Sequence, residues 1–136
     1  MERNFVVFTT EVFRDEQPDE ELDQWFLGED CARWLHQKLL AVPGVAHGAA
    51  PLEEDWHGWS FGLRAHEVWF WINVWCSFNE RKTWIVGIEP RPGLLGAFRK
   101  ERTRQAKAML SDAIDSVLAS AHEVTSHHWH DKNPLE

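Results

Sequence analysis

Four histidines gather in the stretch HEVTSHHWH at residues 122–130; they are His122, His127, His128 and His130. If this stretch forms a strand, His128 and His130 share one face, as two ligands of a zinc site would. A third ligand would have to be Glu123 or the distant His57, and nothing in the sequence fixes either one. The ordinary alternative, which we favour, is a set of solvated or lightly packed histidines.

A second group of reactive side chains is the acidic run in EEDWHGW at residues 53–59. Paired carboxylates perform acid–base catalysis when their surroundings differ enough to separate their pKa values. Adjacent acids in a loop rarely have such different surroundings. This run therefore does not by itself indicate an active site.

The cysteines and the known motifs give no further sign of catalysis. Cys31 and Cys76 fall on apolar faces of an expected helix and an expected strand, where a thiol is normally inert. The sequence has no phosphate-binding loop, dinucleotide fingerprint, CxxC or HExxH. The one basic segment, RKERTRQAK at 99–107, is typical of a solvated helix face. We therefore expect a protein that is not an enzyme, with no catalytic residue, cofactor or metal site.

The tryptophans are the most informative residues in the chain. The stretch VWFWINVWCSF at 68–78 contains Trp69, Trp71 and Trp75, three of the nine tryptophans, all at odd positions. In a strand these three share one face, and the apolar even-numbered residues form the other. If no second layer covers the three tryptophans, they form an exposed apolar patch of the kind that marks an interface. The alternative is that another part of the chain packs over them.

The bulk composition limits the possible partners and compartments. Hydrophobic residues make up 43% of the chain and charged residues 26%, as in soluble globular proteins. The net charge is -8, with -9 in residues 1–60 and +1 in residues 61–136, which argues against nucleic-acid binding. No apolar run approaches the roughly 20 residues that span a bilayer, and the N-terminus lacks the order of a signal peptide. These features predict a cytoplasmic protein without membrane partners.

The spacing of apolar residues predicts one α+β domain over residues 1–136, in the order β-α-β-β-β-α-β. We expect an antiparallel sheet of four to five strands packed against two helices. The predicted strands are 5–13, 56–64, 67–78, 83–89 and 122–130; the predicted helices are 27–42 and 97–121; and 44–55 is a flexible connection.

The alternation of side chains also predicts a strand register. A turn at Ala65-His66 would pair Leu63 with Val68, and Arg64 with Glu67 as an opposite-charge pair. In the same register Gly62 lies beside Trp69, and Ser60 beside Trp71. In the next hairpin Trp75 would lie beside Gly87. Small residues thus face the three tryptophans, so that each ring can lie across bare backbone.

The segment EEDWHGWSFGL resembles a group of small bacterial proteins with an EDWGW-like signature and no established biochemistry. The matching residues are Glu54, Asp55, Trp56, Gly58 and Trp59. The resemblance extends over about 25–130, through IEP at 88–90, GLLGAF at 93–98 and the closing Trp129, and departs from the signature at the inserted His57. It implies a similar fold and no particular activity.

For function, the acidic chain and its aromatic strand favour a non-enzymatic protein-binding module. One concrete form is an immunity- or antitoxin-like protein that neutralises a basic partner; a homodimer is another way to use the same face. The expected partner-binding residues are Trp69, Trp71, Trp75, Glu54, Asp55 and Trp56. The alternative is a small-ligand or metal-binding protein that uses the tryptophans or the C-terminal histidines.

Overall fold

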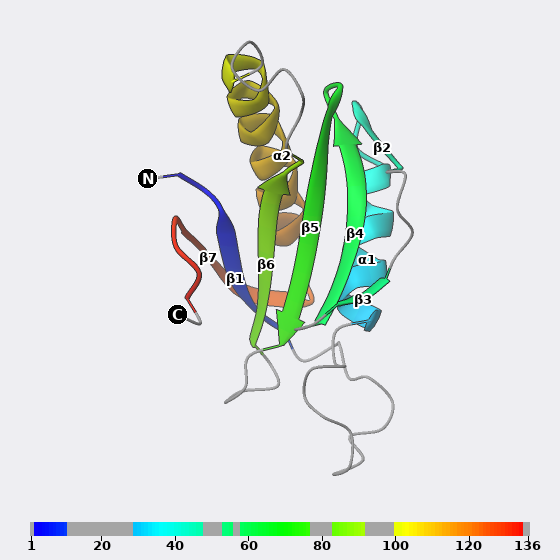
Figure 1. Ribbon diagram of the computed structural model, residues 1–136. Helices are drawn as coiled ribbons and strands as arrows, with labels where there is room; N and C mark the ends of the chain where they lie inside the picture. The colour runs from blue at the N-terminus through cyan, green and yellow to red at the C-terminus, as the bar shows by residue number, and fades with distance from the viewer. Residues whose placement is uncertain are drawn as a thin grey trace.

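The computed structural model describes residues 2–10, 29–47, 53–55, 58–76, 83–91 and 100–134. These residues form one antiparallel sheet with two helices on one of its faces, so the predicted α+β class is confirmed (Figure 1). The strands are β1 (Phe5–Thr10), β2 (Val45–His47), β3 (Glu53–Asp55), β4 (Gly58–Ala65), β5 (Val68–Cys76), β6 (Thr83–Pro90) and β7 (Val124–His130); the helices are α1 (Glu29–Leu40) and α2 (Lys100–Ser120). Neither helix is long and apolar enough to cross a membrane.

The sheet order is β2-β4-β5-β6-β1-β7, and β3 also pairs with β4. The predicted order of helices and long strands is confirmed, but the sheet has seven strands rather than four to five. The two extra strands, β2 and β3, have three residues each and lie within 44–55, where we expected only a connection. Such short strands carry too few alternating residues to be recognised from the sequence.

Helix α1 (Glu29–Leu40) lies within the predicted range of 27–42 and ends two residues before the predicted end. Glu29 and Asp30 occupy the first turn, where acids complement the helix dipole, and Arg33 binds Glu29 across one turn at 2.8 Å. After Leu40 the chain turns through Gly44, whose φ of 86° is unfavourable for other residues. Leu35 and Leu39 are fully buried on the apolar stripe.

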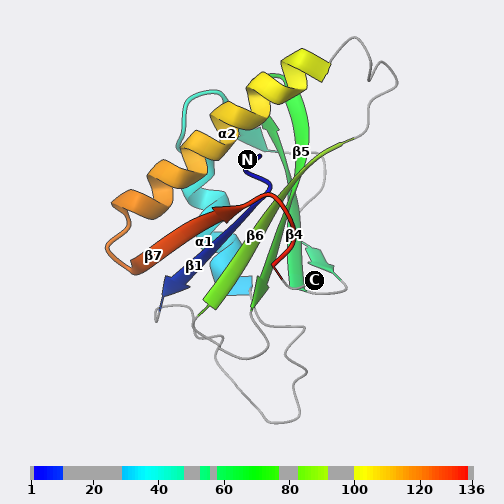
Figure 2. The same cartoon turned by 90° about the vertical axis from the view of Figure 1, so that its left-hand side faces the viewer.

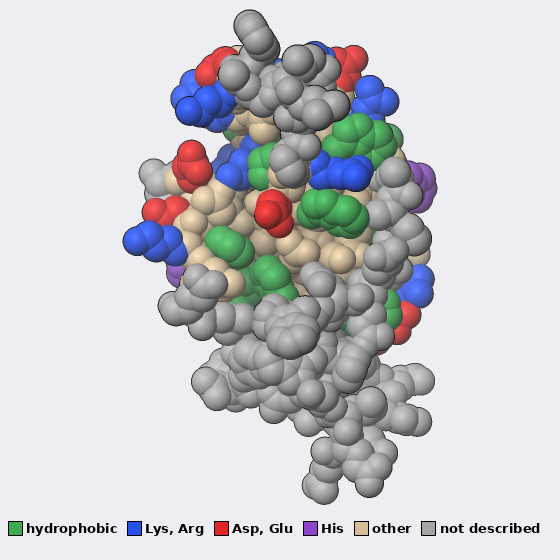
Figure 3. All heavy atoms as spheres, in the orientation of Figure 1, with side chains coloured by type: hydrophobic (Ala, Val, Ile, Leu, Met, Phe, Trp, Pro, Cys, Tyr) green, Lys and Arg blue, Asp and Glu red, His purple; other side chains and the backbone are tan. Residues whose placement is uncertain are grey.

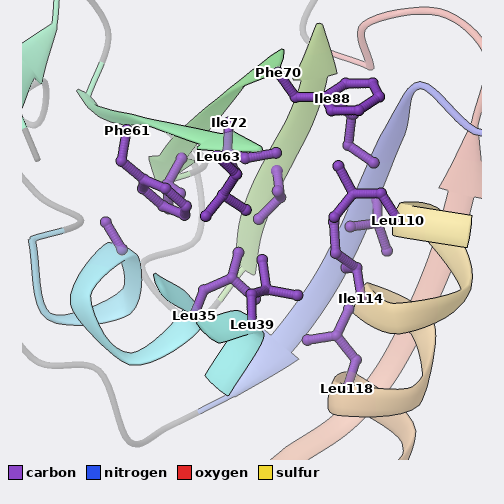
Figure 4. Packing of buried hydrophobic residues seen from close by; sticks show 14 of the residues in the cluster. Leu35, Leu39, Phe61, Leu63, Phe70, Ile72, Ile88, Leu110, Ile114 and Leu118 are labelled. Carbon is purple, nitrogen blue, oxygen red and sulfur yellow. The ribbon is translucent and has the colours of Figure 1, made fainter. Parts of the chain in front are cut away.

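The main core lies between the helices and the sheet. Figure 4 shows leucines and isoleucine of α1 and α2 pointing toward the side chains of β4, β5 and β6. Turned by 90°, the molecule has both helices on one side of the sheet, and the last turn of α2 leads into β7 (Figure 2). The predicted core face is confirmed in these buried residues: Phe61, Leu63, Phe70, Ile72, Val74, Trp84, Val86 and Ile88.

The register between β4 and β5 differs from the prediction by two residues. Leu63 pairs with Phe70 rather than Val68, because the turn is formed by His66 and Glu67 and not by Ala65-His66. Both turn residues have positive φ, 51° and 71°, as a two-residue hairpin turn of the primed type requires. A shift of two preserves the faces, so the predicted separation of core and tryptophans holds although the individual pairs were wrong.

The register between β5 and β6 is also shifted by two. Trp75 pairs with Ile85, and Gly87 pairs with Asn73. The predicted backbone pairing of Trp75 with Gly87 was therefore wrong. The ring of Trp75 nevertheless reaches Gly87 diagonally, because a Cβ added at Gly87 would lie 3.1 Å from two of its atoms. The prediction that Gly87 lies beneath the Trp75 ring is therefore correct, although Gly87 pairs with Asn73.

Candidate functional site: the tryptophan face of the sheet

The sheet face that carries Trp69, Trp71 and Trp75, here called the tryptophan face, lies opposite both helices. Along β5 the even-numbered residues from Phe70 to Val74 are buried against the helices, while the tryptophans are only partly buried. Within the described part of the chain, no helix or strand forms a second layer over this face. Figure 3 looks onto it and shows hydrophobic side chains next to basic ones, in separate areas rather than one continuous patch.

Two arginines stack on two of these tryptophans. The guanidinium carbon of Arg64 lies 5.8 Å from the centroid of the Trp69 ring, and that of Arg91 lies 5.5 Å from the centroid of Trp71. Both distances are within the range of a cation–π interaction. The strand register explains both positions. Arg64 is the cross-strand partner of Trp69 on β5. Arg91 is held beside the same strand because its backbone N–H donates to the Trp69 carbonyl at 2.9 Å.

The third tryptophan occupies a more closed position. The Phe5 and Trp75 rings lie 6.4 Å apart between centroids and are tilted by 33°. Gly87 lies beneath both of them, since an added Cβ would also come within 3.1 Å of the Phe5 ring. The bare backbone lets the two rings approach the sheet, so Trp75 is held mainly by its own chain.

The arginines of this site were not among the predicted site residues. The sequence predicted a pair between Arg64 and Glu67, but Glu67 forms an ion pair with Arg102 of α2 instead. The pairing failed because Glu67 lies in the turn, where it has no cross-strand partner. The signal that could have identified Arg64 was its even position on β4, the same face as the odd positions of β5.

The acidic run at Glu53–Asp55 forms the short strand β3. Glu54 and Asp55 lie in β3, where their backbones pair with Trp59 and Gly58 of β4. Trp56, the remaining predicted partner-binding residue, lies outside the described residues. The structure thus places β3 at the edge of the sheet beside β4.

The C-terminal histidines are separated rather than gathered. His127 is bound to Asp115 of α2, with 2.9 Å between its Nε2 and the carboxylate Oδ1. His122 is 93% exposed, beside Glu123, and the positions of His128 and His130 in β7 put them on the other face from His127. Among the described residues, no group of three or more His, Cys, Asp or Glu is arranged to hold a metal ion. The geometry gives the metal-binding alternative no support there.

His127 belongs instead to a cluster of side chains that we call the α2–β7 corner. It consists of Asp112 and Asp115 from α2, His127 and Trp129 from β7, and Arg3, which precedes β1. Asp115 Oδ1 accepts hydrogen bonds from Trp129 Nε1 at 2.9 Å and is bound by His127 at the same distance. The bond from Trp129 is the main cause that holds the pKa of Asp115 below its ordinary value; partial burial opposes it, and His127 adds to it.

Arg3 completes this corner by binding both an aromatic ring and a carboxylate. Its guanidinium carbon lies 5.4 Å from the Trp129 ring centroid, and its Nη2 lies 2.6 Å from Asp112 Oδ1. The same nitrogen donates to the Ala108 carbonyl at 3.3 Å. Here a stacked arginine also has its carboxylate partner within the chain.

Two further features lie on the helix side of the sheet. A pocket of about 520 Å³ lies between the turn after α1 and the outer side of α2, and Met109, 48% exposed, is part of its lining along with Val42 and Val117. The rings of His36 and His47 meet edge to face at 5.2 Å, and burial, with a smaller effect of His47, lowers the pKa of His36. The pocket is also lined by Ser116, Ser120 and His66, but the Ser120 hydroxyl donates to the Ser116 carbonyl, and no described hydrogen bond joins either serine to His66.

Comparisons of the chain with protein-family models, with curated proteins and with solved structures find no match. The resemblance to the EDWGW-like group therefore stays a prediction.

Proposed function

We propose that this chain is a protein-binding module that holds its partner against the tryptophan face. The observation that carries the proposal is the position of Trp69 and Trp71, partly exposed on the sheet face opposite both helices and stacked by arginines. Tryptophan and arginine are the residues most enriched in binding hot spots, since both combine a large apolar surface with hydrogen-bond donors.

The architecture supports the same proposal. The helices fill one side of the sheet with a packed core to which neither Trp69 nor Trp71 belongs. An immunity- or antitoxin-like role is the narrower form of this proposal, in which the bound partner is a toxic protein that the module neutralises.

The test is capture of a partner from the source cells, with the chain as bait and mild cross-linking. We expect a protein in stoichiometric amount with the wild type, and a loss of roughly tenfold or more with Trp69→Ala/Trp71→Ala, as for hot-spot residues. The matched control is Met109→Ala, which removes an exposed apolar side chain from the helix side.

Circular dichroism and thermal melting of each variant establish that the fold is intact. Equal capture by the wild type and the double tryptophan variant would contradict the proposal, and so would the absence of any stoichiometric partner.

A further inference from the structure

The arginines of the molecule divide into two groups by their partners. Of the described arginines, Arg3, Arg33, Arg102 and Arg104 each form an ion pair with a carboxylate of the chain. Arg64 and Arg91 are the two described arginines that form no such pair with a described acid, and both lie on the tryptophan face. The two described arginines without such an ion pair therefore both lie where the partner is proposed to bind.

A guanidinium stacked on a ring is still able to bind an anion. Its flat face contacts the aromatic system, while its N–H groups point outward in the guanidinium plane, where a carboxylate can accept two parallel hydrogen bonds. The α2–β7 corner shows this complete arrangement, because Arg3 stacks on Trp129 and binds Asp112 at the same time. On the tryptophan face, Arg64 with Trp69 and Arg91 with Trp71 repeat the stacking without a carboxylate from the described residues.

We infer that the partner supplies the missing carboxylates: the tryptophan face binds an acidic segment of a protein, whose Asp or Glu side chains pair with Arg64 and Arg91. This inference rests on the proposed function and adds the chemistry of the partner's contact surface. The partner's contact surface is then negative, whereas the net charge of -8 alone would favour a positive one. Charges at contact distance decide the pairing, because more distant charges are screened beyond about 8 Å in physiological salt.

By register Glu53 and Asp55 of β3 share this face, opposite Ser60 and Gly58 of β4, and the third described acid with a position on it is Glu89, two residues before Arg91 on β6 and opposite Trp71. Glu89 is exposed and makes no ion pair with either arginine. A second copy of the chain could supply Glu89 as a carboxylate, and light scattering distinguishes that case. Single-stranded nucleic acid would stack on the tryptophans, but it carries a phosphate at every nucleotide, and this face has only two described arginines to pair with them. An acidic protein segment needs only a few carboxylates at the contact.

The test uses a display library of random 12-residue peptides selected on the immobilised full chain in 150 mM salt. We expect enrichment of peptides with several Asp or Glu residues and at least one large apolar residue. Arg64→Gln/Arg91→Gln should weaken binding of a selected peptide about tenfold, as expected for the loss of charged hydrogen bonds. Arg64→Lys/Arg91→Lys is the matched control; it should lose less, because the charge remains while stacking and paired donation are weakened.

Several outcomes would overturn the inference. They are enrichment of Lys- or Arg-rich peptides, absence of acidic enrichment, tighter binding of a 12-nucleotide oligo-dT, and a dimer in light scattering that dissociates in the Arg-to-Gln variant. If selected peptides lose binding with Trp69→Ala/Trp71→Ala but not with the Arg-to-Gln variant, the face binds protein without carboxylate pairing. In that case the proposed function stands and this inference fails; if neither variant changes binding, both fail.

Discussion

The α2–β7 corner and the tryptophan face are built from the same side chains but are completed differently. In the corner, Trp129 is stacked by Arg3, and carboxylates of α2 bind both residues at 2.6 to 2.9 Å. On the tryptophan face, Trp69 and Trp71 are stacked by arginines that lack a described carboxylate. The role of an arginine stacked on a tryptophan therefore depends on its anion. Where a carboxylate of the same chain binds the arginine, the contact joins two elements; where none does, the arginine is available to a partner.

The largest expected difference between the two regions is in the contribution of their tryptophans to stability. Trp129→Ala removes packing against the core and the hydrogen bond to Asp115, so we expect a loss of about 3 kcal/mol in the free energy of unfolding. Trp71→Ala removes a ring from a face with no second described layer, so we expect about 1 kcal/mol or less. Urea unfolding of the two variants measures both values. Equal losses would show that the two faces are buried alike.

Asp115 makes the stability of the corner dependent on pH. The pKa of its carboxyl is lowered in the folded state, so its stabilisation is present above the unfolded value near 4 and is lost as the pH falls through the folded value. At pH 7 we expect Asp115→Asn to be less stable than the wild type by about 1 kcal/mol. The gap should narrow below about pH 4.

Denaturant midpoints from pH 7 to pH 3 measure this gap. Asp131→Asn serves as the control, because its exposed side chain has no described partner. A gap for Asp115→Asn that stays constant down to pH 3 would mean that the carboxylate is not what holds Trp129 and His127 together.

The smallest expected effect is the difference in stability loss between substitutions of Arg3 and of Arg91. Arg3→Gln breaks an ion pair as well as a stacking contact and should cost about 1 kcal/mol of stability. Arg91→Gln breaks only the stacking contact, so we expect about 0.5 kcal/mol or less. Thermal melting in low salt resolves the two. A larger loss at Arg91 would mean that its stacking serves the fold rather than a partner.

The fold could be predicted from the sequence because its strongest signals are periodic. The even residues of β5 and the apolar stripes of the helices define the core face whatever the exact pairing, since a register shift of two leaves every side chain on its face. The pairing itself depends on the turn, and His66-Glu67 is not a typical sequence for positive φ at both positions. That is why the face was predicted correctly and the individual partners were wrong.

The candidate site was predictable only in part. Trp69, Trp71 and Trp75 were identified by spacing, but their arginines were not, because Arg91 follows the end of β6 and reaches Trp71 diagonally. The same limit applies to His127, whose carboxylate partner lies twelve residues earlier on α2 and is brought close only by the turn between α2 and β7. Contacts made by side chains across elements depend on geometry that local patterns do not contain.

The place of β1 in the sheet has a consequence for how the protein is made. It lies between β6 and β7, with Val6 opposite Val86 on one side and Trp129 on the other. During synthesis the apolar residues of this early strand have no sheet partner until β6 has emerged, and the second partner comes some forty residues later. Strand pairing over such a sequence distance is slow and leaves the waiting strand open to misassembly. Although β1 precedes the other described strands in the chain, it is thus among the last of them to be fully paired, and the growing chain depends on its surroundings to protect FVVFTT until then.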